Sequence, residues 1–133
     1  MRTKLPTWGA WKNKSKQTNN IDDWRRSSEF EYEGSVKEGT TIYYGDLTKK
    51  PINKPILVSK EEYEKLFLAF KNMKEPIILG TSQSIPPEGS VGYWLVRNVS
   101  DANGTQIASY VGSILIHEKY AIKGEDPATI EFL

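Results

Sequence analysis

Residues 59–74 carry the pattern that most restricts how this chain can fold. Ser59 precedes Glu62 by three residues, and serine and glutamate at that spacing form a capping box that starts a helix. Four large apolar side chains then recur at helical spacing: Tyr63, Leu66, Phe67 and Phe70. Pro76 stops the segment, because proline does not continue a helix. The pattern predicts a helix with one apolar face, which other elements must bury.

Two more apolar stripes at helical spacing follow. Ser90 can cap a helix whose apolar face holds Val91, Trp94, Leu95 and Val99. The third stripe consists of Ile107, Tyr110, Val111, Ile114 and Leu115. An alternative pairs residues 91–99 with 105–116 as strands, because Asn103-Gly104 is a strong hairpin signal. We expect helices, since a 3.6-residue period fits 105–118 better than strict alternation.

Strand patterns lie on both sides of these helices. Residues 29–47 are expected to form a hairpin that turns at Lys37-Glu38-Gly39-Thr40, and Ile56-Leu57-Val58 a short strand. Residues 120–133 read as strand, turn, strand, with the turn at Gly124-Glu125-Asp126-Pro127. The predicted fold class is α+β, with an N-terminal arm and β-hairpin followed by three helices and a second hairpin.

The first 28 residues are polar and irregular, which indicates weak intrinsic order. They also contain Trp8, Trp11 and Trp24, and large aromatic rings usually bury much of their surface. We expect an extended arm that docks through its tryptophans on the body or on a partner. The predicted organisation is therefore an arm over 1–28, a hairpin and connector over 29–58, and a helical domain over 59–133.

Charge is unevenly distributed, although the net charge is only +1. Residues 1–28 carry seven Lys or Arg against two Asp, a net of +5. Residues 75–133 carry three Lys or Arg against seven Asp or Glu, a net of −4. Such asymmetry indicates a basic arm for an anionic partner, or simply an exposed tail that keeps the chain in solution.

The order helix, helix, helix, hairpin in 59–133 resembles a winged helix-turn-helix domain. The stretch that carries the resemblance is Thr105 to Leu115, followed by Glu118-Lys119-Tyr120-Ala121, where Lys119 replaces the usual glycine. In DNA-binding members the third helix enters the major groove and the wing reaches the backbone or minor groove. The resemblance implies groove-facing positions at Gln106, Ser109, Ser113 and His117, with Lys123 on the wing.

That face departs from the usual pattern because it contains only one lysine, beside Glu118, Glu125 and Asp126. Lys and Arg contacts to phosphate supply most non-specific DNA affinity. We therefore expect the arm to add the missing charge, through Lys12, Lys14, Lys16, Arg25 and Arg26. Trp8, Trp11 or Trp24 would stack on bases if the target is single-stranded.

The predicted function is a non-enzymatic, DNA-binding small protein. The alternative is a protein-interaction module, such as a small inhibitor or assembly factor, that docks through Trp8, Trp11, Trp24 and an acidic wing. The position of the basic arm separates the two. Basic groups on the same face as helix 105–117 would favour DNA, whereas an acidic face or one buried by the arm would favour a protein partner. A homodimer through a hairpin edge or the third helix stays open.

The sequence gives little indication of a catalytic site or a metal site. The chain has no cysteine and one histidine, His117, so neither a thiolate site nor a histidine-rich zinc site is expected. Glu29, Glu31 and Glu33 alternate on one strand face, and we interpret them as the solvated side of an edge strand. We expect no cofactor. No apolar run has the length of a membrane helix, and a cytoplasmic location is expected.

Overall fold

The computed structural model describes residues 2–8, 11, 29–45, 48, 53–73, 75–80, 86–126 and 128–133. In chain order the elements are β1 (Thr3–Pro6), β2 (Glu29–Ser35), β3 (Gly39–Tyr43), β4 (Ile56–Ser59), α1 (Lys60–Phe70), β5 (Ile77–Ile78), α2 (Val91–Asn98), the 3-10 helix η4 (Ser100–Ala102), α3 (Ala108–His117), β6 (Ala121–Lys123) and β7 (Thr129–Phe132).

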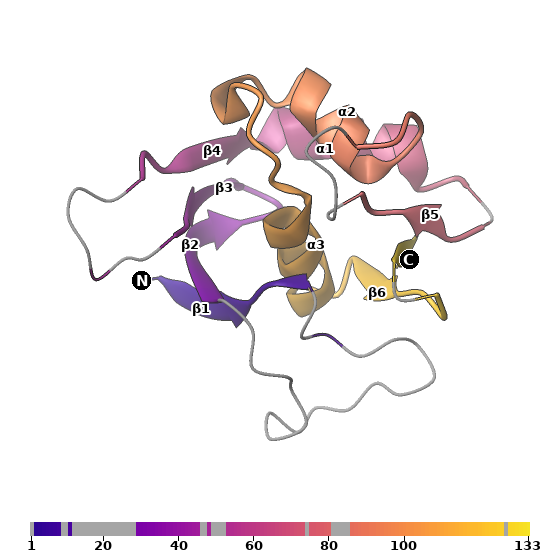
Figure 1. The fold of residues 1–133 in the computed structure, drawn as a ribbon, viewed down its shortest axis with the longest axis horizontal. Coiled ribbons are helices and arrows are strands. Elements are labelled where there is room, and N and C mark those ends of the chain that lie inside the picture. The colour runs from indigo at the N-terminus through magenta and orange to yellow at the C-terminus, as the bar shows by residue number, and fades with distance from the viewer. Residues whose placement is uncertain are drawn as a thin grey trace.

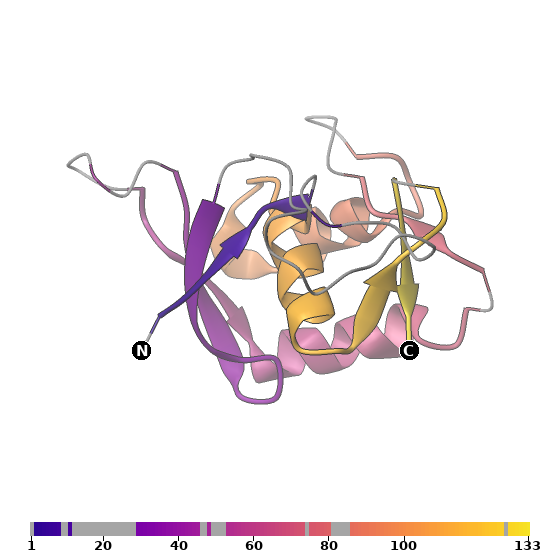
Figure 2. The ribbon, with the colours of Figure 1, turned by 90° about the horizontal axis from the view of Figure 1, so that it is seen from below.

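Two antiparallel sheets lie on opposite sides of α3. The larger sheet has the strand order β1-β2-β3-β4 and the smaller one the order β5-β7-β6. Figure 1 shows α3 between the two sheets, with α1 and α2 along one side of the molecule. In Figure 2, α1 runs from the four-stranded sheet toward the small sheet. The fold is thus α+β, as the sequence predicts.

The capping box of α1 is confirmed. Ser59 Oγ accepts a hydrogen bond from the Glu62 amide at 3.1 Å, and Glu62 Oε1 accepts one from the Ser59 amide at 2.9 Å. The predicted apolar face is buried at Tyr63, Leu66 and Phe70. The first turn of a helix has backbone amides without partners inside the helix, and here the capping box supplies an acceptor. The apolar face of the helix is the side that packs against the core.

The choice between helices and a hairpin for residues 91–116 is settled in favour of helices. Ser90 Oγ caps α2 by accepting from the Tyr93 amide at 3.1 Å. Asn103 and Gly104 have φ angles of 50° and 84°, so they turn the chain between η4 and α3. Asn and Gly both tolerate this left-handed region, which explains why the pair also suits a hairpin.

Two strand assignments differ from expectation. Residues 3–6 form β1, which pairs with β2 in the register Leu5↔Phe30 and buries Leu5, where an irregular arm was expected. As a result β2 pairs on both sides, and the interpretation of its glutamates as an edge-strand face is wrong. Arg2 instead lies 3.6 Å from Glu31 and 3.6 Å from Glu33.

Helix α3 is the centre of the core. Its residues 111–115 are buried, and all the large side chains among them are fully covered. Tyr110 packs on Phe30 of β2 at 5.0 Å between ring centroids, and the other side of α3 contacts β6. The two sheets therefore share one core through α3. No helix in the described part of the chain is both long and apolar enough to cross a bilayer.

Candidate nucleic-acid interface

Two tryptophans cover the middle of the α3 face that the winged-helix resemblance assigns to DNA; together, Trp8 and Trp11 are called the tryptophan strap below. Trp8 is only 4% exposed. The Trp11 indole N–H donates to Ser113 Oγ at 2.9 Å, and Ser113 Oγ donates in turn to the Ser109 carbonyl at 2.9 Å. The strap also turns on itself, since the Trp11 amide donates to the Trp8 carbonyl at 3.1 Å. The expected docking of the arm through its tryptophans is confirmed for these two.

Gly112 makes room for the strap in the middle of α3. A Cβ atom at this position would lie 2.8 Å from Trp8 Cε3 and 3.0 Å from Leu79 Cδ2, closer than such atoms approach in proteins. The missing side chain therefore lets the Trp8 ring lie directly on the helix. The small residues Gly112 and Ser113 indicate from the sequence that another part of the chain packs closely on this helix, but they do not identify that part.

Lys123 holds the strap from the other side. Its side chain lies on β6 and is 5% exposed. The ammonium donates to the carbonyl oxygens of Trp8, at 3.2 Å, and Trp11, at 2.8 Å. It also lies 5.0 Å from the centroid of the Trp8 ring, within the range of a cation–π contact. Strap, Ser113 and Lys123 form one connected set across residues far apart in the sequence.

The remaining groove positions do not form a common exposed face. Gln106 is half-buried, and its side-chain oxygen accepts from the Ala108 amide at 3.1 Å, so it supports the start of α3. Ser109 is half-buried beside the strap. His117 is exposed at the other end of the helix, with its ring 6.5 Å from that of Tyr32.

The orientation expected for Ser113 and Lys123 is therefore wrong. Both side chains were expected to face a nucleic acid, yet Ser113 is 0% and Lys123 5% exposed. The cause is the strap, whose position no local pattern in residues 105–123 indicates. Lys12, Lys14, Lys16, Trp24, Arg25 and Arg26 lie outside the described residues, and their roles stay predictions.

The chain on either side of those basic residues is nevertheless placed. Trp11 is bonded to α3, and Glu29 pairs with Pro6 of β1 at the start of β2. Residues 12–26, called the basic segment below, hold five Lys or Arg against Asp22 and Asp23. Trp11 and Glu29, the described residues nearest this segment in the chain, thus both lie on the side of the molecule where β1 and the strap meet α3.

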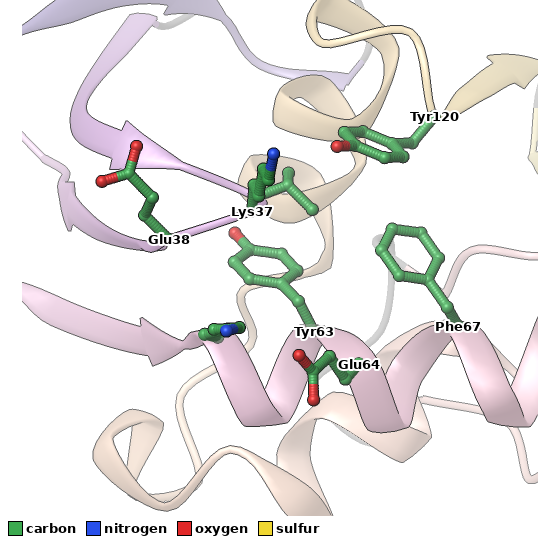
Figure 3. Close-up of a pocket in the computed structure, with 8 residues that line it drawn as sticks. Lys37, Glu38, Tyr63, Glu64, Phe67 and Tyr120 are labelled. Atoms are coloured by element: carbon green, nitrogen blue, oxygen red, sulfur yellow. The ribbon is translucent and has the colours of Figure 1, made fainter.

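A pocket of about 580 Å³ lies elsewhere, between the β2–β3 turn, α1 and the residues that follow α3. Figure 3 shows Tyr63, Phe67 and Tyr120 pointing toward it, with Lys37, Glu38 and Glu64 around them. The Phe67 and Tyr120 rings are 5.2 Å apart. The Tyr63 hydroxyl is hydrogen-bonded to Thr40 Oγ1 at 2.7 Å, and burial raises the pKa of Tyr63. The pocket suits an apolar or aromatic group, and no sequence pattern had indicated it.

The charge of the described surface is opposite to that of the basic segment. The described residues hold ten Lys or Arg against fourteen Asp or Glu, a net of −4. Within that part of the chain, no three His, Asp or Glu side chains gather as metal ligands would. No protein-family model, curated protein or solved structure matches the chain.

Proposed function

We propose that the protein is a non-enzymatic, nucleic-acid-associated protein that contacts the phosphate backbone through the basic segment. The observation that carries the proposal is the anchoring of Trp11, the residue just before Lys12, on α3 and β6. Burial of this face of α3 by Trp8 and Trp11 is the arrangement expected for a protein partner, so the nucleic-acid proposal depends on the basic segment and not on the helix face. Lys and Arg side chains are the groups that neutralise phosphates and release counterions.

We further propose that residues 59–133 are a winged-helix-like unit. Three helices are followed by the hairpin β6–β7, and β5 joins that hairpin to make a three-stranded sheet. This order of helices and strands supports the resemblance to a winged helix, and it does not assign the chain to a family. Fold alone does not determine function, so the proposal depends on the basic segment rather than on this architecture.

The expected mode of binding is independent of sequence. While the strap is docked, Trp8 and Trp11 cover the middle of α3, and of the four groove positions on or beside α3 only His117 is exposed, so the helix is poorly placed to read bases in a groove. Phosphate contacts fix position and carry no sequence information by themselves. Trp8 and Trp11 are also occupied within the chain, so stacking on bases by these two is not expected.

Fluorescence anisotropy with labelled double- and single-stranded DNA of several sequences, at about 50 and 200 mM salt, tests the proposal. We expect binding that weakens steeply with salt and varies little with sequence. Arg25→Ala/Arg26→Ala should lower affinity and reduce the slope of log K against log salt by about two. The matched control is Lys54→Ala/Lys65→Ala, which removes the same charge from two exposed positions, one before β4 and one on α1. No binding at micromolar protein, or equal losses in both double variants, would contradict the proposal.

A second candidate function is protein docking at the aromatic pocket. Tyr120, which lines the pocket, is 36% exposed, and the 59% exposed Leu133 is bonded to it by a hydrogen bond from the Leu133 amide to the Tyr120 carbonyl. A partner that inserts an aromatic or branched side chain would fit this site. Trp8 and Trp11 themselves are packed within the chain, so the pocket rather than these two tryptophans would receive the partner.

Quantitative pull-downs separate the two candidates. Proteins retained by the wild type and by Arg25→Ala/Arg26→Ala, but lost with Tyr120→Ala, would favour docking at the pocket. Tyr120 is a suitable position because its side chain is exposed, so truncation removes little of the core, and thermal unfolding of the variant checks that the fold is kept. Equal capture by the wild type and Tyr120→Ala would eliminate the pocket as a docking site.

A further inference from the structure

The lining of the aromatic pocket carries charges of both signs in equal number. Lys37 and Glu38 belong to the β2–β3 turn, and Lys60 and Glu64 belong to α1. All four are exposed, and in the described part of the chain none of them takes part in an ion pair. A pocket bordered by one sign of charge would select a partner of the opposite sign, whereas this mixture selects neither a basic nor an acidic partner. A surface that presents both signs can instead match a copy of itself.

One face of α1 continues from these charges to an exposed apolar side chain. Lys60, Glu64 and Leu68 are spaced by four residues, so they lie along the same side of the helix and are called the α1 stripe below. Leu68 is 81% exposed, more than any other large apolar side chain among the described residues. It extends a pocket that Phe67 and Tyr120 line, as Figure 3 shows for these two rings. Pocket and stripe together form an apolar centre with charges at its border, which is the usual arrangement of an interface.

The order of the two charges on α1 favours pairing between chains over pairing within the helix. A glutamate stabilises a helix best when it precedes a lysine by four residues, whereas here Lys60 precedes Glu64. If a two-fold axis crosses α1 at a right angle midway between them, Lys60 of each copy faces Glu64 of the other. The same axis carries Leu68 of each copy to the start of α1 in the other. There Gly39 pairs with Ser59, so the β2–β3 turn and its side of the pocket lie next to that position.

We propose that the protein forms a reversible two-fold homodimer through the aromatic pocket and the α1 stripe. The formal net charge of +1 produces no strong repulsion between two copies. This surface differs from both dimer surfaces expected from the sequence, a hairpin edge and the third helix, and much of α3 is buried. The inference names the partner of the pocket, so it rests on the second candidate function. It does not depend on nucleic-acid binding, because none of its residues belongs to the basic segment.

Sedimentation equilibrium between about 1 μM and 1 mM protein measures the self-association. We expect the average mass to rise with concentration from one chain toward two. Leu68→Glu places a charge in the apolar centre and should weaken the dimer at least about tenfold. Because Leu68 is 81% exposed, this substitution removes nothing from the core, and thermal unfolding checks that the fold is kept. The control is Lys65→Glu, at an exposed position of α1 outside the stripe, which should associate like the wild type.

Two charge reversals test the two-fold arrangement. In a dimer of Lys60→Glu, glutamate would face glutamate, and in a dimer of Glu64→Lys, lysine would face lysine. Each variant alone should therefore stay monomeric at concentrations where the wild type dimerises. An equal mixture of the two variants should dimerise again, because every facing pair then has opposite charges. Both positions are exposed, so the reversals leave the core intact.

Self-association of the wild type, its loss in Leu68→Glu and in each charge reversal, and its recovery in the mixture support the inference. A wild type that remains one chain at about 1 mM overturns it. Self-association that these variants leave unchanged, or that the mixture does not recover, overturns it as well. Capture of a different protein by a monomeric wild type, lost with Tyr120→Ala, would overturn the homodimer and keep the pocket as a docking site. The nucleic-acid proposal is decided separately, by Arg25→Ala/Arg26→Ala.

Discussion

Gly112 shows at the scale of one residue how the strap restricts the sequence of α3. Glycine within a helix is about 1 kcal/mol less favourable than alanine, so Gly112→Ala should stabilise the isolated helix. In the folded protein the new methyl group would meet Trp8 at 2.8 Å and Leu79 at 3.0 Å. We expect a net destabilisation of about 1–3 kcal/mol in urea unfolding, with displacement of the strap. A more stable variant with an unchanged Trp11 indole resonance would show that Trp8 is not packed tightly on α3.

Tyr63 should make the protein sensitive to alkaline pH. The ring is buried and burial raises the pKa of its hydroxyl, whereas in the unfolded chain the pKa is about 10. Above that pH the unfolded state loses a proton that the folded state keeps. The stability is therefore complete below about pH 10 and falls above it by at most about 1.4 kcal/mol per pH unit from this residue.

Tyr63→Phe should remove that part of the pH dependence. It leaves Thr40 Oγ1 without its partner, so we expect a loss of about 1 kcal/mol at neutral pH but a shallower decline above pH 10. Denaturant unfolding of both proteins between about pH 8 and 11.5 measures this, with Tyr93→Phe as the control at a partly exposed tyrosine. Parallel pH profiles for the wild type and Tyr63→Phe would refute the assignment.

At the scale of elements, Glu62 does more than cap α1. Its Oε1 accepts from the Ser59 amide, and its Oε2 accepts from the Ser100 amide at 3.1 Å, which ties the start of α1 to η4. Ser59→Ala should cost about 1 kcal/mol, the usual value for a lost N-cap. Glu62→Ala should cost clearly more, because two amides lose their acceptor. Equal losses in urea unfolding would mean that the Ser100 contact contributes nothing.

The elements that the sequence predicts are those with complete local signals. The helix over 59–74, the helix capped by Ser90 and the hairpin at Lys37 to Thr40 each combine periodicity with a cap or a turn. By contrast, β1 has four residues and includes Pro6, and β5 has two residues. Both exist because distant strands, β2 and β7, supply their hydrogen bonds. Such pairing cannot be read from a short window.

The candidate interface, like the short strands, depends on contacts between residues far apart in the sequence. Large aromatic rings are unfavourable in water, so the sequence predicts that Trp8 and Trp11 dock on the body or on a partner, and the structure shows both on the body. Where they dock depends on Gly112, Ser113 and Lys123, which lie about 100 residues further along the chain. Helical periodicity places Ser113 opposite the main apolar stripe, but it cannot show that a second layer covers that side. The aromatic pocket likewise arises only when the β2–β3 turn, α1 and the residues after α3 meet.

On the scale of the whole molecule, the N-terminal sheet and the helical half are linked by a carboxylate. Glu118, at the C-terminal end of α3, accepts from the Tyr32 hydroxyl at 2.6 Å and from the Val36 amide at 3.0 Å. Both donors belong to the β2–β3 hairpin. Together with the Phe30–Tyr110 contact, this joins residues 29–45 to α3 along its length. The expected boundary at residue 59 therefore crosses a continuous core.

A fragment of residues 59–133 should consequently not fold alone, although it contains all three helices. Without residues 1–58, α3 would expose the face that carries Gly112, Ser113 and Tyr110, and Glu118 would lose both donors. The fragment would no longer bury the apolar surface of its central helix. Small domains are only marginally stable, so we expect this loss of burial to exceed the stability of the fragment. We expect the full chain to unfold in one transition, identical by far-ultraviolet circular dichroism and tryptophan fluorescence, and the fragment to show little cooperative unfolding. A fragment with a sharp transition of its own would instead establish the helical half as an independent domain and the sheet and strap as an addition to it.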